Sequence, residues 1–405
     1  MDRTQRRALF ATFAGWGLDG MDVQIYSFVI PTLIALWGIS QGQAGILGTA
    51  ALLLSALGGW LAGMLADRVG RVRLLQITVA WYAFFTFLSG FTHSFEQLLV
   101  TRGLQGLGFG GEWAAGSVLM GELADPRFRG RAVGTVQSGW AVGWGVAVLA
   151  STLLFSLLPE NWAWRAMFWL GLLPALLVVY IRRHVREPEV FQATRRKVEA
   201  GARASSAEIF GEGLLRTTVL ASLMTTGIQG GYYAITTWLP TYLKSVRHLS
   251  VLNSGAYLAV VILGSFAGYI TAAYLADLIG RRRKILLFAV LSAATVVAYA
   301  YLPISDRMML VLGFPLGFFA SGIFSGLGPY LTELYPTRVR GAGQGFAYNF
   351  GRGVGALFPG LVGFLSAQMS LGPAIALFAV IAYALVVGML LLLPETAGKE
   401  LVAYD

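Results

Sequence analysis

Long apolar runs fill most of the chain, and short polar segments separate them. A helix needs about 20 predominantly apolar residues to cross a bilayer, and this rule predicts twelve membrane-spanning helices in the sequence. The longest polar break, from about 182 to 216, divides these helices six and six. The predicted spans are 8–37, 44–66, 74–92, 97–121, 132–158, 162–181, 217–243, 251–276, 285–303, 308–331, 342–367 and 371–394.

Two motifs occur once in each half of the chain. The segment "GMLADRVGRVR" (63–73) recurs as "AYLADLIGRRR" (273–283), and "GELADPRFRGRAVG" (121–134) recurs as "TELYPTRVRGAGQG" (332–345). Because both motifs repeat at nearly the same separation, the halves are predicted to be duplicated six-helix bundles. Parallel repeats of this kind move against each other around a site near the bilayer midplane. We therefore expect an all-α membrane protein made of two pseudo-symmetric six-helix bundles.

The distribution of positive charge orients these helices. The formal net charge is +10, and most of the 30 Lys and Arg residues, including the run 281–284, fall on the same face as the N-terminus. By the positive-inside rule this face is cytoplasmic, so we expect an inner-membrane protein with both termini in the cytoplasm and no nucleic-acid partner. The organisation is then an N-terminal bundle (1–181), a cytoplasmic linker (182–216) and a C-terminal bundle (217–405), which we expect to act as a monomer. The basic residues on the opposite face are Arg165, Lys244, Arg247 and Arg307.

Composition excludes several kinds of chemistry. Hydrophobic residues make up 56% of the chain and charged residues 12%, whereas soluble chains carry about 25% charged residues. Cysteine is absent, which excludes disulfides, thiolate metal sites and a cysteine nucleophile. The three histidines lie in polar surroundings between the apolar runs. We therefore expect neither a metal nor another cofactor, and we do not expect an enzyme.

Two predicted spans of the N-terminal half, the first and the fourth, carry charged residues in their interior. The segment "GWGLDGMDVQIYSF" contains Asp19 and Asp22 at mid-depth, and the fourth span contains Arg102 and Glu112, which lies about 15 Å deeper at 1.5 Å rise per residue. Asp22 is the best candidate partner for Arg102. An acid whose positive partner moves can change its protonation, so all four residues are candidates for proton coupling. Alternatively, the Asp–Arg pair is a permanent brace and Glu112 is a neutral packing residue.

One arginine lies inside a span of the C-terminal half, which has no acid within its spans. The segment "AYNFGRGVGALFPG" places Arg352 near the midplane, with Tyr348 and Asn349 close to it in the helical pattern. A guanidinium group matches a carboxylate with two hydrogen bonds. We expect Arg352 to bind the carboxylate of an anionic substrate. The alternative is a pair with an acid of the N-terminal half, such as Glu112.

Polar aromatic residues of the seventh span are candidates for the same site. The segment "GIQGGYYAITTWLP" places Gln229, Tyr232 and Tyr233 on one helix face. Trp113 and Tyr26 could complete the cavity from the N-terminal half. Aromatic rings with polar ends suit a flat or ringed acid, although aromatic residues in membrane proteins also serve as packing or as an interfacial belt.

Several motifs resemble those of the major facilitator superfamily along essentially the whole chain. These are the G-x-L-A-D-R-x-G-R loop after the second span, its repeat after the eighth, and "RGLQGLGFGG" in the fourth. Within that superfamily, "LDGMD", "GGEW", "WAWRAMFWLGLLP" and "REPE" resemble the sialate:proton and aromatic-acid:proton symporter families. The narrower resemblance implies small organic anions as substrates, and in organic-ion transporters of the superfamily an arginine at the place of Arg352 goes with anionic substrates.

The resemblance also implies a cytoplasmic gate that holds the two halves closed on the inside. The alternative is that its arginines act only as orientation signals. The residues of this gate are Asp67, Arg68, Arg71, Glu122, Arg129, Asp277, Arg281, Glu333 and Arg340.

Together these observations predict a secondary active transporter that works by alternating access. We expect proton-coupled symport of a small organic anion, namely an aromatic or heteroaromatic monocarboxylate. The alternative is a carrier of a neutral polyol or sugar, or a drug exporter of the same fold.

Overall fold

A computed structural model describes residues 3–69, 71–123, 129–176, 179, 206–336 and 339–396. In these residues every regular element is a helix, which confirms the all-α prediction. Counting α12 with α13 and α14 with α15 as one span each, the described helices account for twelve spans. Their order is α1 (Arg3–Trp37), α2 (Gln41–Val69), α3 (Arg71–Ser89), α4 (Phe95–Leu123), α5 (Arg129–Leu157), α6 (Glu160–Trp169), the 3-10 helices η1 (Leu170–Leu172) and η2 (Ser206–Phe210), α9 (Leu215–Thr241), the π-helix η3 (Tyr242–Val246), α10 (Val251–Ile279), α11 (Arg281–Val296), the π-helix η4 (Val297–Tyr301), α12 (Asp306–Gly322), α13 (Leu327–Leu334), α14 (Arg340–Gly355), α15 (Leu357–Leu365) and α16 (Leu371–Leu392).

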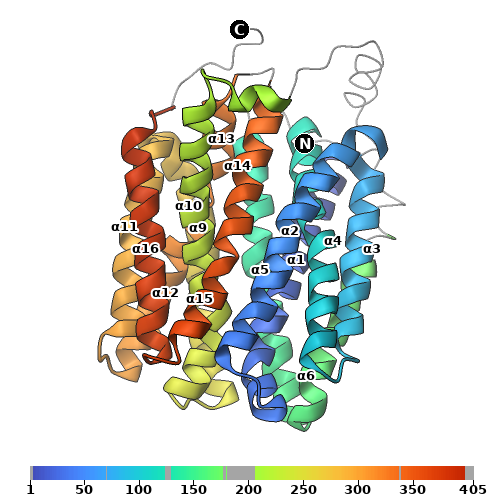
Figure 1. Ribbon diagram of the computed structural model, residues 1–405, viewed down its shortest axis with the longest axis vertical. Coiled ribbons are helices and arrows are strands. Elements are labelled where there is room, and N and C mark those ends of the chain that lie inside the picture. The colour runs from blue at the N-terminus through green and yellow to red at the C-terminus, as the bar shows by residue number, and fades with distance from the viewer. Residues whose placement is uncertain are drawn as a thin grey trace.

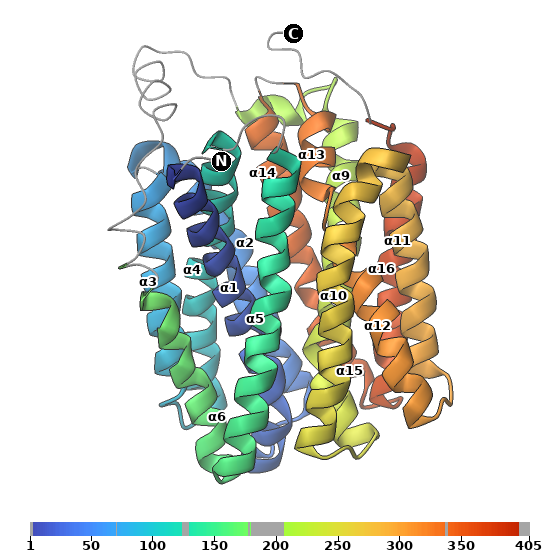
Figure 2. The ribbon, with the colours of Figure 1, turned by 180° about the vertical axis from the view of Figure 1, so that it is seen from behind.

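The helices form two groups that lie side by side. Helices α1 to α6 make one group and α9 to α16 the other, and most run roughly along the long axis of the molecule (Figure 1 and, from behind, Figure 2). The beginning of α1 and the end of α16 lie at the same end of the molecule (Figure 1). Most of the expected linker lies outside the described residues, and the part that is described contains η2, a turn and the start of α9.

Helix α9 differs from the other long helices in composition and surroundings. Within the described residues, eight helices are long and apolar enough to cross a membrane, and α9 is not one of them although it has 27 residues. Its middle reads "TTGIQGGYYAITT", and almost every residue from Ala221 to Thr241 is buried. Its threonine hydroxyls donate to carbonyls of their own helix, as Thr226 does to Ser222 at 2.9 Å and Thr236 to Tyr232 at 2.9 Å. A polar helix can therefore lie at the centre of the protein.

The tenth span is broken into α12 and α13, and a buried lysine stabilises the break. Gly326 has φ +91° at this point, a left-handed conformation that glycine adopts at little cost. The carbonyls freed by the break accept from the fully buried Lys284 Nζ, at 2.6 Å for Gly322 and 3.1 Å for Ile323, and Ser325 O accepts as well. We counted Lys284 among the loop cations that orient the protein, and this was wrong because its ammonium group is inside the C-terminal bundle.

The two groups of helices are in contact at the end opposite to the start of α1. There, a Cβ atom on Gly45 of α2 would lie 2.7 Å from the carbonyl oxygen of Pro359 in α15. Beside it, Gly360 N donates to Thr49 Oγ1 at 3.2 Å. Lys244, just after α9, forms an ion pair of 3.1 Å with Glu160 at the start of α6. The ends of α2 and α15 are thus too close to admit a solute between them in this conformation.

Candidate functional site

Asp22 and Arg102 are joined through a glutamine that the sequence patterns did not single out. Both residues are buried, Asp22 on α1 and Arg102 on α4. Arg102 Nη1 donates to Gln105 Oε1 at 2.7 Å, and Gln105 Nε2 donates to Asp22 Oδ2. Gln105 lies one turn after Arg102 on the same helix, so its i, i+3 spacing was the signal that could have found it. The expected pair of Asp22 and Arg102 is brought together as a chain of three side chains.

Tyr26 lies directly beside this chain of side chains. The guanidinium carbon of Arg102 is 4.5 Å from the centre of the Tyr26 ring, a distance at which the ring face attracts a cation. The Tyr26 hydroxyl donates to Ala44 O on α2. The ring is thereby fixed between α1, α2 and α4, and it supports the position of Arg102.

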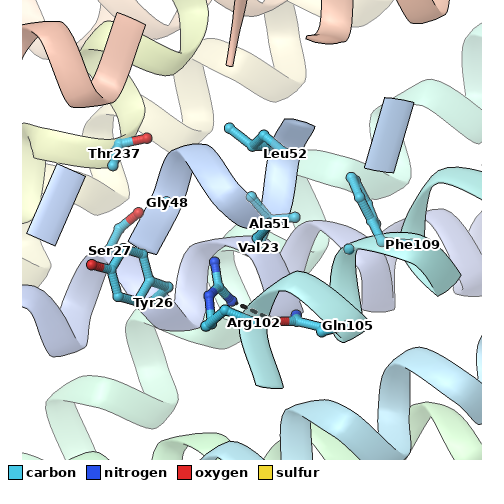
Figure 3. Close-up of a pocket in the computed structure, with 11 residues that line it drawn as sticks. Val23, Tyr26, Ser27, Gly48, Ala51, Leu52, Arg102, Gln105, Phe109 and Thr237 are labelled. Atoms are coloured by element: carbon cyan, nitrogen blue, oxygen red, sulfur yellow. Dashed lines mark hydrogen bonds between the residues drawn. The ribbon is translucent and has the colours of Figure 1, made fainter. Parts of the chain in front are cut away.

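A pocket opens on Arg102 and Tyr26. Its wall comes from α1, α2, α4 and α9 (Figure 3). Figure 3 shows the side chains of Arg102 and Gln105 with the hydrogen bond between them. The polar and aromatic residues of the wall are Tyr26, Ser27, Arg102, Gln105, Phe109 and Thr237. Tyr26 and Arg102 were expected at the site, whereas the other four were not.

Arg352 is buried at the boundary between the two halves. Its side chain is on α14 and is 1% exposed. Its guanidinium carbon lies 5.1 Å from the centre of the Tyr348 ring and 5.1 Å from that of Phe109, which belongs to α4. Nη2 is 3.4 Å from the Tyr348 hydroxyl, whereas Nε and Nη1 find no hydrogen-bond partner among the described residues. The guanidinium group therefore keeps hydrogen-bonding capacity for another group.

Asp19 is the acid that acts on Arg352. Asp19 is fully buried on α1, and it is a weaker electrostatic partner of Arg352 than Tyr348 and Tyr233 are. The two aspartates of α1 thus interact with different arginines, because Arg102 acts electrostatically on Asp22. The side chain of Glu112, which we considered as the partner of Arg352, lies outside the described residues, and so does that of Trp113.

Gln229 and Tyr233 of α9 reach the same region as Arg352. Gln229 Nε2 donates to Tyr348 O at 2.8 Å, and the Tyr233 hydroxyl donates to Gln229 Oε1 at 3.2 Å. Tyr233 also interacts electrostatically with Arg352. This close approach of α9 and α14 requires a small residue, because a Cβ atom on Gly351 would collide with Thr225.

Two other expected members of this cluster lie elsewhere. The Tyr232 hydroxyl accepts from Trp140 Nε1 of α5 at 2.7 Å, and its ring packs 5.3 Å from that of Phe324 near the break in the tenth span. The Asn349 side chain donates to Gly345 O at 3.0 Å and packs against α2, where a Cβ atom on Gly59 would collide with it. The structure therefore places Asn349 at the contact between α2 and α14 instead of in the cluster around Arg352.

The described part of the expected gate lies in the C-terminal half. Arg281 pairs with Asp277 at 3.0 Å and with Glu333 at 3.4 Å, and Arg340 Nε donates to Thr332 O at 3.0 Å. These contacts all join elements of the same half. The gate side chains of the N-terminal half lie outside the described residues; they are Asp67, Arg68, Arg71, Glu122 and Arg129.

Comparison with known proteins identifies the family. The sequence model of the Major Facilitator Superfamily matches residues 12–307 and 258–403. The chain belongs to the Major Facilitator Superfamily. Its membership agrees with the motifs of the sequence and with the two groups of helices, and it makes the chain a multi-pass membrane transporter and not an enzyme.

Individual superfamily members resemble the chain along nearly its full length. A probable 4-methylmuconolactone transporter of Cupriavidus pinatubonensis is 44% identical, over 97% of this chain and 91% of the relative. A cis,cis-muconate transport protein of Acinetobacter baylyi is 31% identical, over 91% of this chain and 89% of the relative. The solved structure of the proton:xylose symporter XylE shares the facilitator fold with a TM-score of 0.73 at 18% identity, over 98% of each chain.

Proposed function

We propose that this transporter carries a small organic anion together with protons across the inner membrane, with both termini in the cytoplasm. The relatives named for 4-methylmuconolactone and cis,cis-muconate support an organic acid as the substrate. The observation that carries the proposal is Arg352, a buried guanidinium group with unused hydrogen-bond donors between the two halves.

The energetics of Arg352 favour an anionic substrate. A buried guanidinium group without full hydrogen bonding is unfavourable, and a carboxylate satisfies it with two charge-assisted hydrogen bonds. The rings of Tyr348 and Phe109 beside it offer faces for a flat unsaturated or aromatic body. A neutral polyol would bring no negative charge to Arg352, so Asp19 would be the one acid that compensates the guanidinium charge.

Asp19 provides the link to protons. When a substrate carboxylate binds Arg352, Asp19 loses its favourable interaction with the guanidinium charge and gains a negative neighbour. Both changes favour protonation of Asp19. The loaded site then has one positive and one negative charge, so the halves can close around it without a buried excess charge. Asp22, which is joined to Arg102 through Gln105 within the N-terminal half, is the second candidate proton carrier.

Uptake into proteoliposomes with an imposed pH gradient tests this proposal. Wild-type protein should accumulate an organic acid when the outside is acidic, and carboxylates should compete where the corresponding amides do not. Asp19→Asn should abolish accumulation while leaving exchange of substrate across the membrane. Arg307→Ala, at an exposed position in the first turn of α12, is the control. The proposal fails if amides compete as well as acids, or if Asp19→Asn still accumulates substrate against its gradient.

A further inference from the structure

The pocket beside Tyr26 is lined by Arg102, whereas Arg352 lies just beyond its edge. Phe109 connects the two arginines, because its ring forms part of the pocket wall and is also in contact with the Arg352 guanidinium group. On α4, Arg102 and Phe109 are seven residues apart, which corresponds to about 10 Å along the helix axis. A small ligand that reaches Arg352 past Phe109 would therefore extend along α4 toward Arg102.

The wall at Arg102 has the features of a binding site for oxygen atoms. Arg102 is 3% exposed, and its Nε has no hydrogen-bond partner among the residues that the structure describes. Gln105 holds one guanidinium nitrogen and at the same time donates to Asp22. Ser27 and Thr237 add hydroxyl groups to the same wall. Groups so arranged can donate to a carbonyl or a carboxylate, and leaving them buried without a partner is unfavourable.

We propose that Arg102 and Gln105 bind a second oxygen-bearing group of the substrate. The carrier then selects acids that carry a carbonyl or a second carboxylate at the end remote from the carboxylate that Arg352 binds. This inference rests on the proposed function, and it replaces the simple monocarboxylate with a substrate that has polar groups at both ends. Asp22, next to Gln105, neutralises Arg102 in the unloaded protein and would be released from it when the second group binds.

Two acids with the same carbon skeleton provide the test. The compounds trans,trans-muconate and sorbate share one conjugated chain, and sorbate has a methyl group where muconate has its second carboxylate. The monomethyl ester of muconate keeps a carbonyl there without the charge. Binding to the purified carrier would be measured by calorimetry. Wild-type protein should bind muconate at least about tenfold more tightly than sorbate, as expected for one additional charge-assisted interaction, with the ester between them.

The variants separate the two anchors. Gln105→Glu keeps the shape of the side chain but places a negative charge beside Arg102, and Arg102→Gln removes the positive charge. Each should weaken muconate to the affinity of sorbate and leave sorbate within about twofold. Retained sorbate binding shows that a variant is folded. Gln97→Glu, an exposed position two turns earlier on α4, should change neither affinity.

The outcomes distinguish this inference from the proposed function. Equal binding of muconate and sorbate by wild-type protein, with both lost in Arg352→Ala, would overturn the inference and leave the proposed function intact. Equal weakening of both acids in Gln105→Glu and Arg102→Gln would overturn it as well. If none of the three acids binds, or if Arg352→Ala binds them as wild type does, the proposed function falls and the inference falls with it.

Discussion

Arg102 and Arg352, the buried arginines in the part of the chain that the structure describes, occupy contrasting surroundings. Arg102 lies within the N-terminal half, where Gln105 connects it to Asp22 and Tyr26 supports its guanidinium group. Arg352 belongs to the C-terminal half, where two aromatic rings flank it and the acid that acts on it, Asp19, comes from the other half. A contact within one half persists when the halves move as rigid bodies, whereas a contact between halves does not.

This difference assigns separate tasks to two aspartates that are only three positions apart on α1. The interaction of Asp19 with Arg352 depends on how the halves are placed, so it can sense the conformation of the carrier. The chain from Asp22 to Arg102 stays within one bundle, so a movement of the halves does not by itself break it. Alternating access requires both a fixed wall and a contact that changes.

The largest expected effect comes from removing the guanidinium group between the halves. Arg352→Ala should lower the initial rate of substrate uptake by at least about 100-fold, because each hydrogen bond to a charged group contributes about 1.5–3 kcal/mol and two are lost. Arg352→Lys should retain part of the activity, since it keeps the charge and loses the paired geometry. Uptake by Arg352→Ala within a few fold of wild type would show that the two arginines do not differ as described.

A double-mutant cycle tests the contact across the boundary. Asp19→Asn removes an electrostatic partner of the buried Arg352, so it should destabilise the unloaded protein by about 0.5–3 kcal/mol. Asp19→Asn combined with Arg352→Gln should recover most of this loss, because no buried charge remains unpaired. Thermal unfolding in detergent measures both. If the double variant is less stable than either single variant, the two residues are not coupled in this way.

The smallest effect is expected at the contact between the halves that lies opposite to the start of α1. Lys244 and Glu160 are 36% and 51% exposed, and such ion pairs contribute about 0.2–1 kcal/mol. Lys244→Glu should therefore shift the balance toward the opposite conformation by only about twofold. Because the chain has no cysteine, a single cysteine at Thr49 would report this shift as faster thiol labelling. The exchange of both charges, Lys244→Glu with Glu160→Lys, should return the labelling rate to that of wild type.

The sequence was enough to predict the spans and to show which spans contain charged residues, since both follow from the composition along the chain. It predicted less well how each helix is turned about its own axis. Tyr348 and Arg352 are one turn apart and do meet, whereas Asn349 is rotated by about 100° from Tyr348 and packs on α2. Which direction faces the pocket depends on close contacts such as that of Gly351 with Thr225, and a single sequence does not reveal those.

Residues that act through another side chain were also missed. Gln105 carries no charge and lies in a glycine-rich stretch, so its i, i+3 spacing from Arg102 was the one signal for it in the sequence, and the structure shows its contacts with Arg102 and Asp22. Phe109 looked like an ordinary apolar residue of α4. Lys284 follows three arginines in sequence, and a charged run normally indicates a solvated loop, whereas the carbonyls exposed at the break in the tenth span provide its site.

The burial of Lys284 has a consequence for the chemical reactivity of the protein. Amines react with acylating reagents as free bases, and they must be reached by the reagent. Lys244 meets the second condition at the end of the protein opposite to the start of α1, whereas the Lys284 amine is enclosed by three carbonyl oxygens and the Phe288 ring. Acylation of Lys284 would thus require the contacts at the break between α12 and α13 to open. The reaction of this amine would therefore report a local opening of the tenth span.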